Sequence, residues 1–285
     1  MANDVRTVNL NDSLLSASSY NALPHIDAMK DVATQNAKAR HVLLGIISSY
    51  GLNRHFSIHL VHKHFDLEGR VMVYETVRKP NHPDFILCSP RVPDRCENLH
   101  GLYFRACPDG TMAAYEYTTD PCEDLSDHTD FVAEFAAAVL RLGVQNVFAL
   151  TAKKPETKRY TEFEMSDLSS TILVNNSTWL PGPGGNSTST DWISSEGVDS
   201  QHTGSNGNGD GIITLTDCTK TQSGRHYNFT CSRTRNGTHY QTRSVAWDDG
   251  KGGQQEQLTL NREIIPIDSE PFAIISYARQ MVQAF

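Results

Sequence analysis

Histidine is concentrated in one stretch of this 285-residue chain. Residues 54–65 read Arg-His-Phe-Ser-Ile-His-Leu-Val-His-Lys-His-Phe and hold four of the twelve histidines: His55, His59, His62 and His64. From position 56 one set of residues alternates with another: Phe56, Ile58, Leu60, His62 and His64 with Ser57, His59, Val61, Lys63 and Phe65. A period of two is typical of a β-strand. We expect residues 66–69 to form a turn and residues 70–77 to form a second strand, so that the stretch is one half of an antiparallel hairpin.

Imidazole nitrogens bind transition metals and exchange protons near neutral pH. His62 and His64 are two residues apart, so a strand places both on one face, with Cα atoms about 7 Å apart. Two imidazoles at that spacing can converge on one divalent transition metal, and Asp66 or Glu68 on the turn is a candidate third ligand, with Glu68 in the cupin-like position. Without a metal, His62 and His64 are candidates for an acid–base pair. The same alternation places His59 on the opposite face.

The order His62-x-His64-x-x-x-Glu68 resembles the first metal-binding motif of the cupins. The resemblance ends there, because Phe56 and Glu75 stand where that motif has glycines, and no second cupin motif follows. A half-buried sheet face, in which each imidazole bonds to a neighbour, explains the same histidines. Metal binding, metal-free acid–base chemistry and a structural role therefore all stay open.

Three further side chains are expected near the histidine pair. Glu75 lies on the predicted partner strand, where a carboxylate fixes the tautomer of an imidazole, so it is a candidate catalytic group. We favour an ordinary cross-strand pair for it. Arg105 and Tyr117 lie on a second predicted hairpin, around a Pro-Asp-Gly turn at 108–110, and are candidates for substrate contacts.

Residues 206–217, Asn-Gly-Asn-Gly-Asp-Gly-Ile-Ile-Thr-Leu-Thr-Asp, partly follow the EF-hand calcium loop. Oxygen ligands stand at loop positions 1, 3 and 5, glycine at 6 and an acid at 12. However, position 1 is Asn206, position 12 is Asp217 where glutamate is usual, and neither flank has a helical pattern. A Gly- and Asn-rich loop before a strand explains the same residues, and we favour it over a calcium site.

Cysteine is sparse, with six residues in the chain, and free thiols are the expectation in a reducing compartment. Cys218 and Cys231 form a special pair. A two-residue turn at 224–225 would place them opposite each other on neighbouring strands, close enough for a disulfide in an oxidising compartment.

The chain is acidic, with a formal net charge of -8, and it has no cluster of Lys and Arg. This composition argues against nucleic acid and anionic membranes as main partners. No apolar run approaches the length of a transmembrane helix, and the N-terminus lacks a signal-peptide pattern, so we expect a cytoplasmic protein. P-loop, GxGxxG, GxSxG, HExxH and kinase motifs do not occur in the sequence, which gives no support to nucleotide or serine-hydrolase chemistry.

The pattern of elements predicts a single α+β domain over residues 20–285, after a flexible tail at residues 1–19. Helices are expected at about 27–51, 127–142 and 270–283, packed on a bent, mostly antiparallel sheet that has barrel-like curvature as a variant. Residues 175–211 are rich in Asn, Ser, Thr and Gly, which predicts a polar loop insertion around a short strand near Trp192. A β-meander follows, with its clearest turn at Asn236-Gly237.

The segments His62-Lys-His-Phe65 and Tyr115-Glu-Tyr-Thr-Thr-Asp-Pro121, with the helix and strand that follow, resemble a set of uncharacterised proteins from filamentous fungi. The resemblance covers roughly residues 20–175. It implies a fungal, cytosolic origin and no particular chemistry, because no activity is attached to that set.

These features favour a soluble enzyme that acts on a small molecule, with His62 and His64 as its metal or acid–base site. The competing hypothesis is a non-catalytic ligand-binding or protein-interaction protein, in which the histidines pack the sheet and residues 175–211 meet a partner. The sequence does not name the substrate, the reaction, a bound metal or the oligomeric state.

Overall fold

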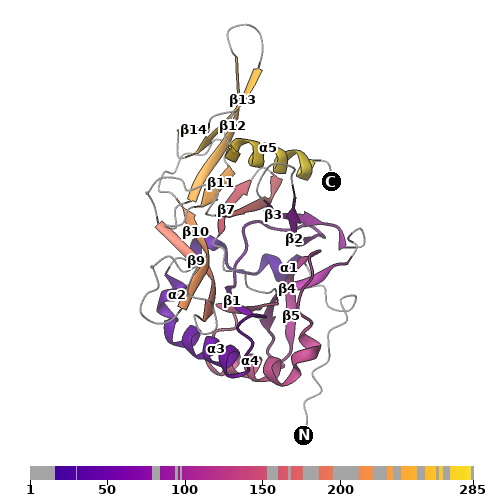
Figure 1. The fold of residues 1–285 in the computed structure, drawn as a ribbon, viewed down its shortest axis with the longest axis vertical. Coiled ribbons are helices and arrows are strands. Elements are labelled where there is room, and N and C mark those ends of the chain that lie inside the picture. The colour runs from indigo at the N-terminus through magenta and orange to yellow at the C-terminus, as the bar shows by residue number, and fades with distance from the viewer. Residues whose placement is uncertain are drawn as a thin grey trace. The chain divides into compact units, whose positions relative to one another are not determined.

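The computed structural model describes residues 17–29, 31–78, 84–93, 96, 98–152, 160–165, 168–175, 186–194, 212–220, 230–233, 239–248, 254–260, 263–265 and 270–283. Helices and a mostly antiparallel sheet are both present (Figure 1), which confirms the predicted α+β class. The helices are α1 (Ala17–Asn21), α2 (Val32–Gln35), α3 (Ala37–Ser49), α4 (Thr129–Arg141) and α5 (Glu270–Gln283), with short 3-10 turns η1 (Ile26–Met29) and η3 (Leu125–His128).

Contacts between residues divide the chain into two compact units. The first unit comprises residues 1–73, 91–157 and 189–215, and the second comprises residues 74–90, 158–188 and 216–285. All four histidines of the 54–65 stretch belong to the first unit.

The first unit contains the strands β1 (Ser57–Leu60), β4 (His100–Ala106), β5 (Met112–Thr118), β6 (Phe148–Thr151) and most of β9 (Asn186–Ser194). Their order in the sheet is β9-β1-β6-β4-β5. The β4–β5 hairpin confirms the predicted Pro-Asp-Gly turn, where Gly110 has a φ of 86° and its N–H donates to the carbonyl of Cys107.

The sheet of the first unit has one apolar face and one polar face. Side chains that are paired across neighbouring strands share a face, and the register pairs Ile58 with Leu150 and with Trp192. Arg40 of α3 lies over the Trp192 ring, 4.8 Å from its centre, so α3 covers this apolar face. The same register pairs His59 with Ala149 and with Asp191 on the opposite, polar face.

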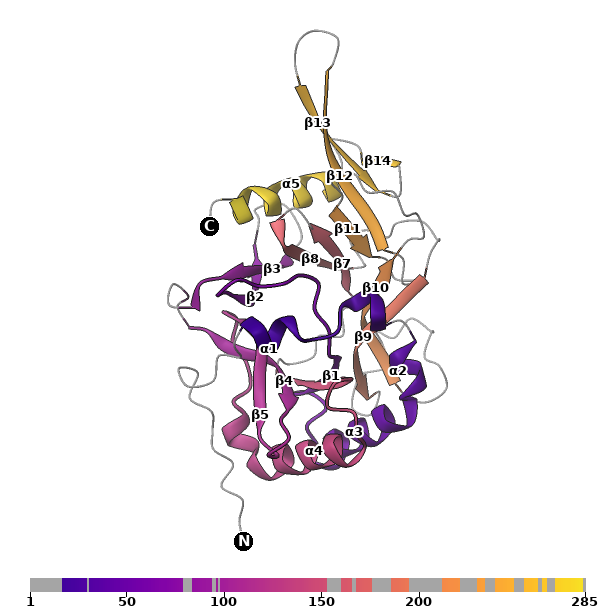
Figure 2. The ribbon, with the colours of Figure 1, turned by 180° about the vertical axis from the view of Figure 1, so that it is seen from behind.

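Helix α4 forms because its apolar residues recur at helical spacing. Its buried side chains are Phe131, Val132, Phe135, Ala136, Ala138 and Val139, a stripe that packs on one side. Gly143, with a φ of 70°, follows the helix in the left-handed conformation that ends many helices. Helices α3 and α4 contact each other and lie side by side in Figures 1 and 2.

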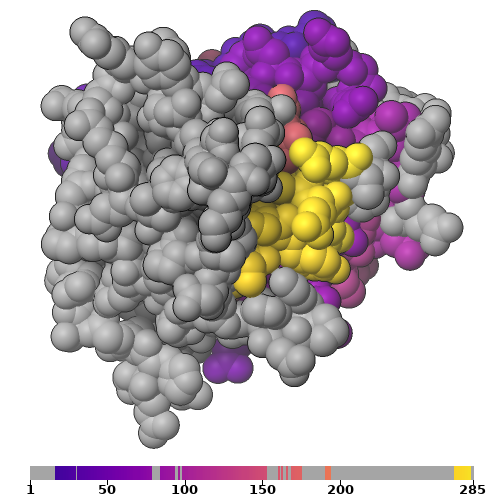
Figure 3. Space-filling model, turned by 90° about the horizontal axis from the view of Figure 1, so that it is seen from above, coloured from indigo at the N-terminus to yellow at the C-terminus, as the bar shows by residue number. Residues whose placement is uncertain are grey.

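The second unit contains the strands β3 (Phe85–Arg91), β7 (Tyr160–Met165), β8 (Ser170–Asn175), β11 (Thr230–Arg233), β12 (His239–Asp248), β13 (Gln254–Leu260) and β14 (Glu263–Ile265). Their order is β3-β8-β7-β11-β12-β13-β14, and β10 (Ile212–Lys220) pairs with β7 in the parallel direction. Helix α5 confirms the predicted C-terminal helix. Its residues Ile274, Ile275 and Ala278 pack on Phe85 and Ile172, while its other side lies at the surface in Figure 3.

The predicted hairpin of residues 56–65 with 70–77 is wrong. Strand β1 ends at Leu60 and pairs with β6 and β9, and β2 (Val71–Val77) is not one of its neighbours in the sheet. Residues 17–19 of the predicted tail belong to α1, while residues 1–16 lie outside the described residues. The predicted helix at 27–51 is broken at Asp31, which has a φ of 66°.

The predicted short strand near Trp192 is confirmed as β9, although most of the 175–211 segment lies outside the described residues. The conditional placement of Cys218 opposite Cys231 is not found among the described strands, because β11 pairs with β7 and β12, and Cys231 lies opposite Gln241. Of the calcium-like loop, residues 206–211 lie outside the described residues and 212–217 belong to β10.

Within the part of the chain that the structure describes, no helix has both the length and the apolar character needed to cross a membrane.

Substitutions at two glycines, Gly101 and Gly45, test the packing of the first unit. A Cβ at Gly101 would collide with the Phe104 ring and lie 2.9 Å from the Cβ of Ala114. We expect Gly101→Ala to lower the free energy of unfolding by about 1–3 kcal/mol, as overpacking does. Gly45 in α3 has nothing within 4 Å of its Cβ position, so Gly45→Ala should raise it by roughly 0.5–1 kcal/mol. Denaturant unfolding of both variants measures this, and equal effects would contradict the packing described.

Candidate functional site

A buried imidazole–carboxylate pair lies on the polar face of the first unit. His59 of β1 and Asp191 of β9 are neighbours across the two strands, and His59 Nδ1 lies 3.1 Å from Asp191 Oδ1. Both side chains are nearly inaccessible, at 3% and 9% exposure. A carboxylate oxygen accepts, so Nδ1 carries the hydrogen and Nε2 is left with a lone pair in the neutral ring. The Thr151 hydroxyl also donates to Asp191 Oδ1, at 3.4 Å.

The His59 ring stacks on two other rings. Its centre lies 3.7 Å from that of Tyr103 of β4 and 5.1 Å from that of His62. Stacked on these rings and bonded at Nδ1, the imidazole has its orientation determined before any ligand binds. The prediction that His59 lies away from His62 is therefore wrong. The alternation of a strand ends with β1 at Leu60, so it does not extend to position 62.

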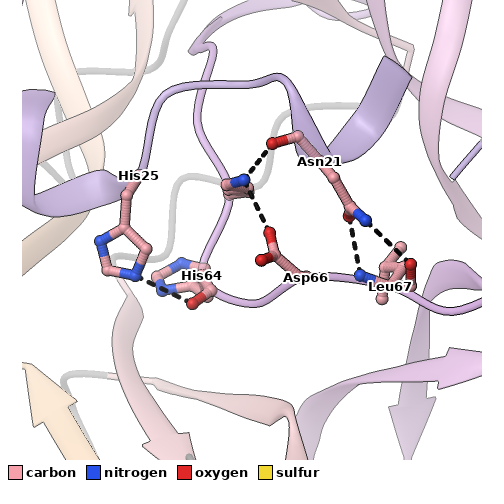
Figure 4. A network of polar contacts seen from close by, with 6 residues as sticks. Asn21, His25, His64, Asp66 and Leu67 are labelled. Carbon is pink, nitrogen blue, oxygen red and sulfur yellow. Dashed lines mark hydrogen bonds and ion pairs between the residues drawn. The ribbon is translucent and has the colours of Figure 1, made fainter. Parts of the chain in front are cut away.

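Residues 61–67 form a loop that is held by the segment 20–29. Lys63 N–H donates to the carbonyl of Pro24, and Ile26 N–H donates to the carbonyl of Lys63, at 2.9 and 3.0 Å. His25 donates from Nε2 to the carbonyl of His64 at 3.0 Å, and the Asn21 amide bonds both backbone groups of Leu67 (Figure 4). These bonds replace a strand partner, so the loop positions its histidines without belonging to the sheet.

The rings of His62 and His64 meet at their Nε2 atoms, which are 3.1 Å apart. His62 Nδ1 lies 2.7 Å from the carbonyl of Leu60, which can only accept, so the Nδ1 hydrogen is fixed there. In the neutral ring the His62 Nε2 then has the lone pair, and His64 Nε2 is the donor. Both side chains are buried, at 3% and 6% exposure. A backbone carbonyl that fixes the tautomer in this way is the usual support of a metal-binding imidazole.

Tyr115 and Arg105 add two buried donors. Tyr115 of β5 is 1% exposed, and its ring lies 6.5 Å from that of His59 and 6.2 Å from that of Tyr103. Among the described residues, the Tyr115 hydroxyl and Arg105 Nε are buried and have no hydrogen-bond partner, and the same holds for His59 Nε2. A buried polar atom left unsatisfied costs about 1–3 kcal/mol.

Burial raises the pKa of the Tyr115 phenol well above its ordinary value, and the negative charges of Glu116 and Asp191 act in the same direction. The phenol therefore keeps its proton, and remains a donor, throughout the neutral range. Glu116 is itself buried and accepts a hydrogen bond of 3.0 Å from the Tyr20 hydroxyl.

Two of the six residues proposed from the sequence come together, the imidazoles of His62 and His64. Glu68 is exposed, in contrast to the buried histidines, and Glu75 belongs to the second unit. Tyr117 packs in an apolar cluster with Val71, Val73 and Ala114, and its hydroxyl donates to the Ala114 carbonyl, which accounts for it as a core residue. Arg105 pairs across the hairpin with Ala113, which is two positions before Tyr115 on β5. Arg105 and Tyr115 therefore share a face of the sheet.

Asp191, Tyr103 and Thr151 are the site residues that sequence reasoning missed. Asp191 is 132 positions from His59, and it lies in a polar segment that gave no sign of a buried carboxylate. The available signal was its place beside Trp192 and Ile193: a strand that buries Trp192 on one face must direct Asp191 to the other.

No family model, curated protein or solved structure matches this chain.

The His59–Asp191 pair can be tested against a surface ion pair. Asp191→Ala leaves His59 Nδ1 buried without its acceptor, so we expect the free energy of unfolding to fall by about 1.5–3 kcal/mol. Asp66→Ala is the control: Asp66 lies 2.7 Å from Lys63 Nζ, but it is 71% exposed, and such pairs contribute about 0–1 kcal/mol. Urea unfolding measures both, and an Asp191→Ala variant as stable as Asp66→Ala would contradict the buried pair.

The burial of Tyr115 predicts a loss of stability in alkali. Its pKa in the folded chain is raised, so above the ordinary value of about 10 the unfolded chain releases a proton that the folded chain keeps. The stabilising contribution is complete below about pH 10 and is lost as the pH rises through the raised pKa. Tyr115→Phe should flatten the fall of the unfolding free energy above about pH 10. An unchanged slope in urea unfolding at several alkaline pH values would rule out a buried phenol.

Proposed function

We propose that this protein is an enzyme that acts on a small molecule and binds a divalent transition metal through His62 and His64. The observation that carries the proposal is the 3.1 Å separation of the two Nε2 atoms. Metal–nitrogen bonds of about 2.0–2.1 Å place neighbouring ligand atoms about 2.9 Å apart at a right angle and about 3.4 Å apart at a tetrahedral angle. The observed separation lies between these values.

The surroundings of the two imidazoles support the same proposal. Nitrogen ligands suit zinc, copper, nickel and iron better than calcium or magnesium. The Leu60 carbonyl already directs the His62 lone pair toward His64, and the His25–His64 bond fixes the loop. Binding requires that the His64 hydrogen move from Nε2 to Nδ1. Only a neutral imidazole binds a metal, so affinity falls as the pH is lowered.

A second candidate is acid–base chemistry without a metal, and the His59–Asp191 pair favours it. An imidazole oriented by a carboxylate at Nδ1 can accept or donate a proton at Nε2. In this version His62 and His64 share a hydrogen bond and pack against His59. The non-catalytic alternative, a ligand-binding or protein-interaction protein, differs from both because it gives these histidines no catalytic role.

The small-molecule partner, the cytoplasmic location and the fungal resemblance remain proposals from the sequence. The chain's negative net charge argues against a nucleic-acid partner.

Cobalt titration tests the metal proposal. We expect chelator-treated protein to bind Co²⁺ with visible absorption bands of nitrogen coordination. His62→Ala and His64→Ala should each weaken binding by at least about tenfold, since each removes one ligand nitrogen. The control is His41→Ala, an exposed histidine of α3, which should bind as the wild type does. Circular dichroism establishes that each variant is folded.

Wild-type protein that binds no Co²⁺, or a folded His62→Ala variant that binds it unchanged, would remove the metal version. The first result would leave the metal-free candidate as the proposal to pursue.

A further inference from the structure

Helices α3 and α4 of the first unit each present one face to solvent. The exposed residues of α3 are Lys38, His41, Val42, Gly45 and Ser49, and those of α4 are Thr129, Asp130, Glu134, Ala137 and Arg141. In both helices they recur every three or four residues, so they share one face. Both helices contact the sheet, α3 at β1 and α4 at β4, and they contact each other (Figure 2). The two exposed faces therefore form one surface, which we name the helix-layer surface.

Bulky apolar side chains are gathered on this surface. Among the described residues, four large apolar side chains are exposed, and three of them belong to α3 or to the residue that follows each helix: Val42 at 42%, Tyr50 at 41% and Leu142 at 37%. Scattered exposed apolar residues need no explanation, whereas apolar residues that gather on one surface are typical of an interaction site.

The two helices run antiparallel. Short connections join α3 to β1 and α4 to β6, and β1 and β6 are antiparallel to each other. The ring of Tyr50, after the last turn of α3, lies 5.6 Å from that of Phe131 in the first turn of α4. The Tyr50 hydroxyl also donates to Glu134 at 2.8 Å. The first turn of α3 therefore lies at the same end of the surface as the last turn of α4.

Opposite charges occupy the two ends of the helix-layer surface. Lys38 in the first turn of α3 and Arg141 in the last turn of α4 lie at one end, and Asp130 and Glu134 in the first two turns of α4 lie at the other. These four are the formally charged residues among those exposed on the two helices. A surface that is positive at one end and negative at the other is complementary to a second copy of itself, turned end for end.

We propose that the helix-layer surface is the interface of a homodimer with two-fold symmetry. In this dimer α4 lies antiparallel to α4 of the second copy, and Arg141 faces Asp130 and Glu134 of that copy. A two-fold axis parallel to the helices would bring like charges together, so the charges select an axis perpendicular to them. The apolar side chains supply affinity and the charges set the orientation, because exposed ion pairs contribute little to binding.

The size of the surface sets the expected affinity. Each helix has 13 residues and is therefore about 20 Å long. Two neighbouring helices, about 10 Å apart, present a surface roughly 20 Å wide. That area is at the low end for specific interfaces, which typically bury about 800 Å² on each partner. We therefore expect a weak dimer that dissociates at micromolar concentrations.

Sedimentation velocity of the full-length protein, from about 1 to about 300 µM, tests the proposal. We expect the sedimentation coefficient to rise from that of a monomer to that of a dimer over this range. Arg141→Glu places a negative charge against Asp130 and Glu134 of the second copy, so it should weaken dimerisation about tenfold or more. The double variant Asp130→Lys, Glu134→Lys should do the same, because its lysines face Arg141.

An equimolar mixture of these two variants should form dimers again, because every facing pair in the mixed dimer has opposite charges. The control is Arg70→Glu, a charge reversal at an exposed residue of the same unit outside the two helices, which should dimerise as the wild type does. Circular dichroism establishes that each variant is folded.

A wild-type protein that stays monomeric over the whole range would overturn the proposal. So would an Arg141→Glu variant that dimerises as the wild type does, or a mixture of the two variants that stays monomeric. The proposed dimer does not use the histidines of the polar face, so the outcome of the cobalt titration has no bearing on it.

Discussion

The docking of β9 on β1 is the constraint on which the first unit depends. Two adjacent residues of β9 make contacts on opposite faces of one sheet. Trp192 packs on the apolar face, with its ring 5.9 Å from that of Phe148, and Asp191 bonds to His59 on the polar face. A buried carboxylate without a partner is expensive, so the strand cannot shift by one residue without burying Asp191 under α3 and moving Trp192 to the polar face. One register thus fixes the core and the site together.

The second constraint is the exit of the chain from the sheet after Leu60. Val61 N–H donates to the carbonyl of Val147, and from there the backbone bonds to the segment 20–29 instead of to a strand. This departure allows His62 to lie against His59 and His64 to reach His62. In a continuing strand the alternation of side chains would have kept His59 apart from the other two.

Local patterns were enough to predict much of the fold, since they depend on residues close in sequence. The helix at 129–141, the hairpin around Gly110 and the strand at Trp192 all follow from periodicity and turn chemistry. The pairing of β1 with β6 and β9 could not be predicted, because long-range register depends on which faces fit. The site was predicted in part for the same reason: His62 and His64 are neighbours in sequence, whereas Asp191 reaches His59 only through that register.

Stability alone does not explain the polar face. Buried ion pairs and imidazoles are replaced by apolar side chains of similar volume at little cost, and often with a gain in stability. A sheet covered by α3 and α4 on one face needs only another apolar layer on the other. Instead, that face carries an oriented imidazole, two imidazole nitrogens at the separation of metal ligands, and a phenol held in its protonated form. Groups that cost stability are typical of binding and reactive sites, and this is the reason for placing the proposed site on the face opposite α3 and α4.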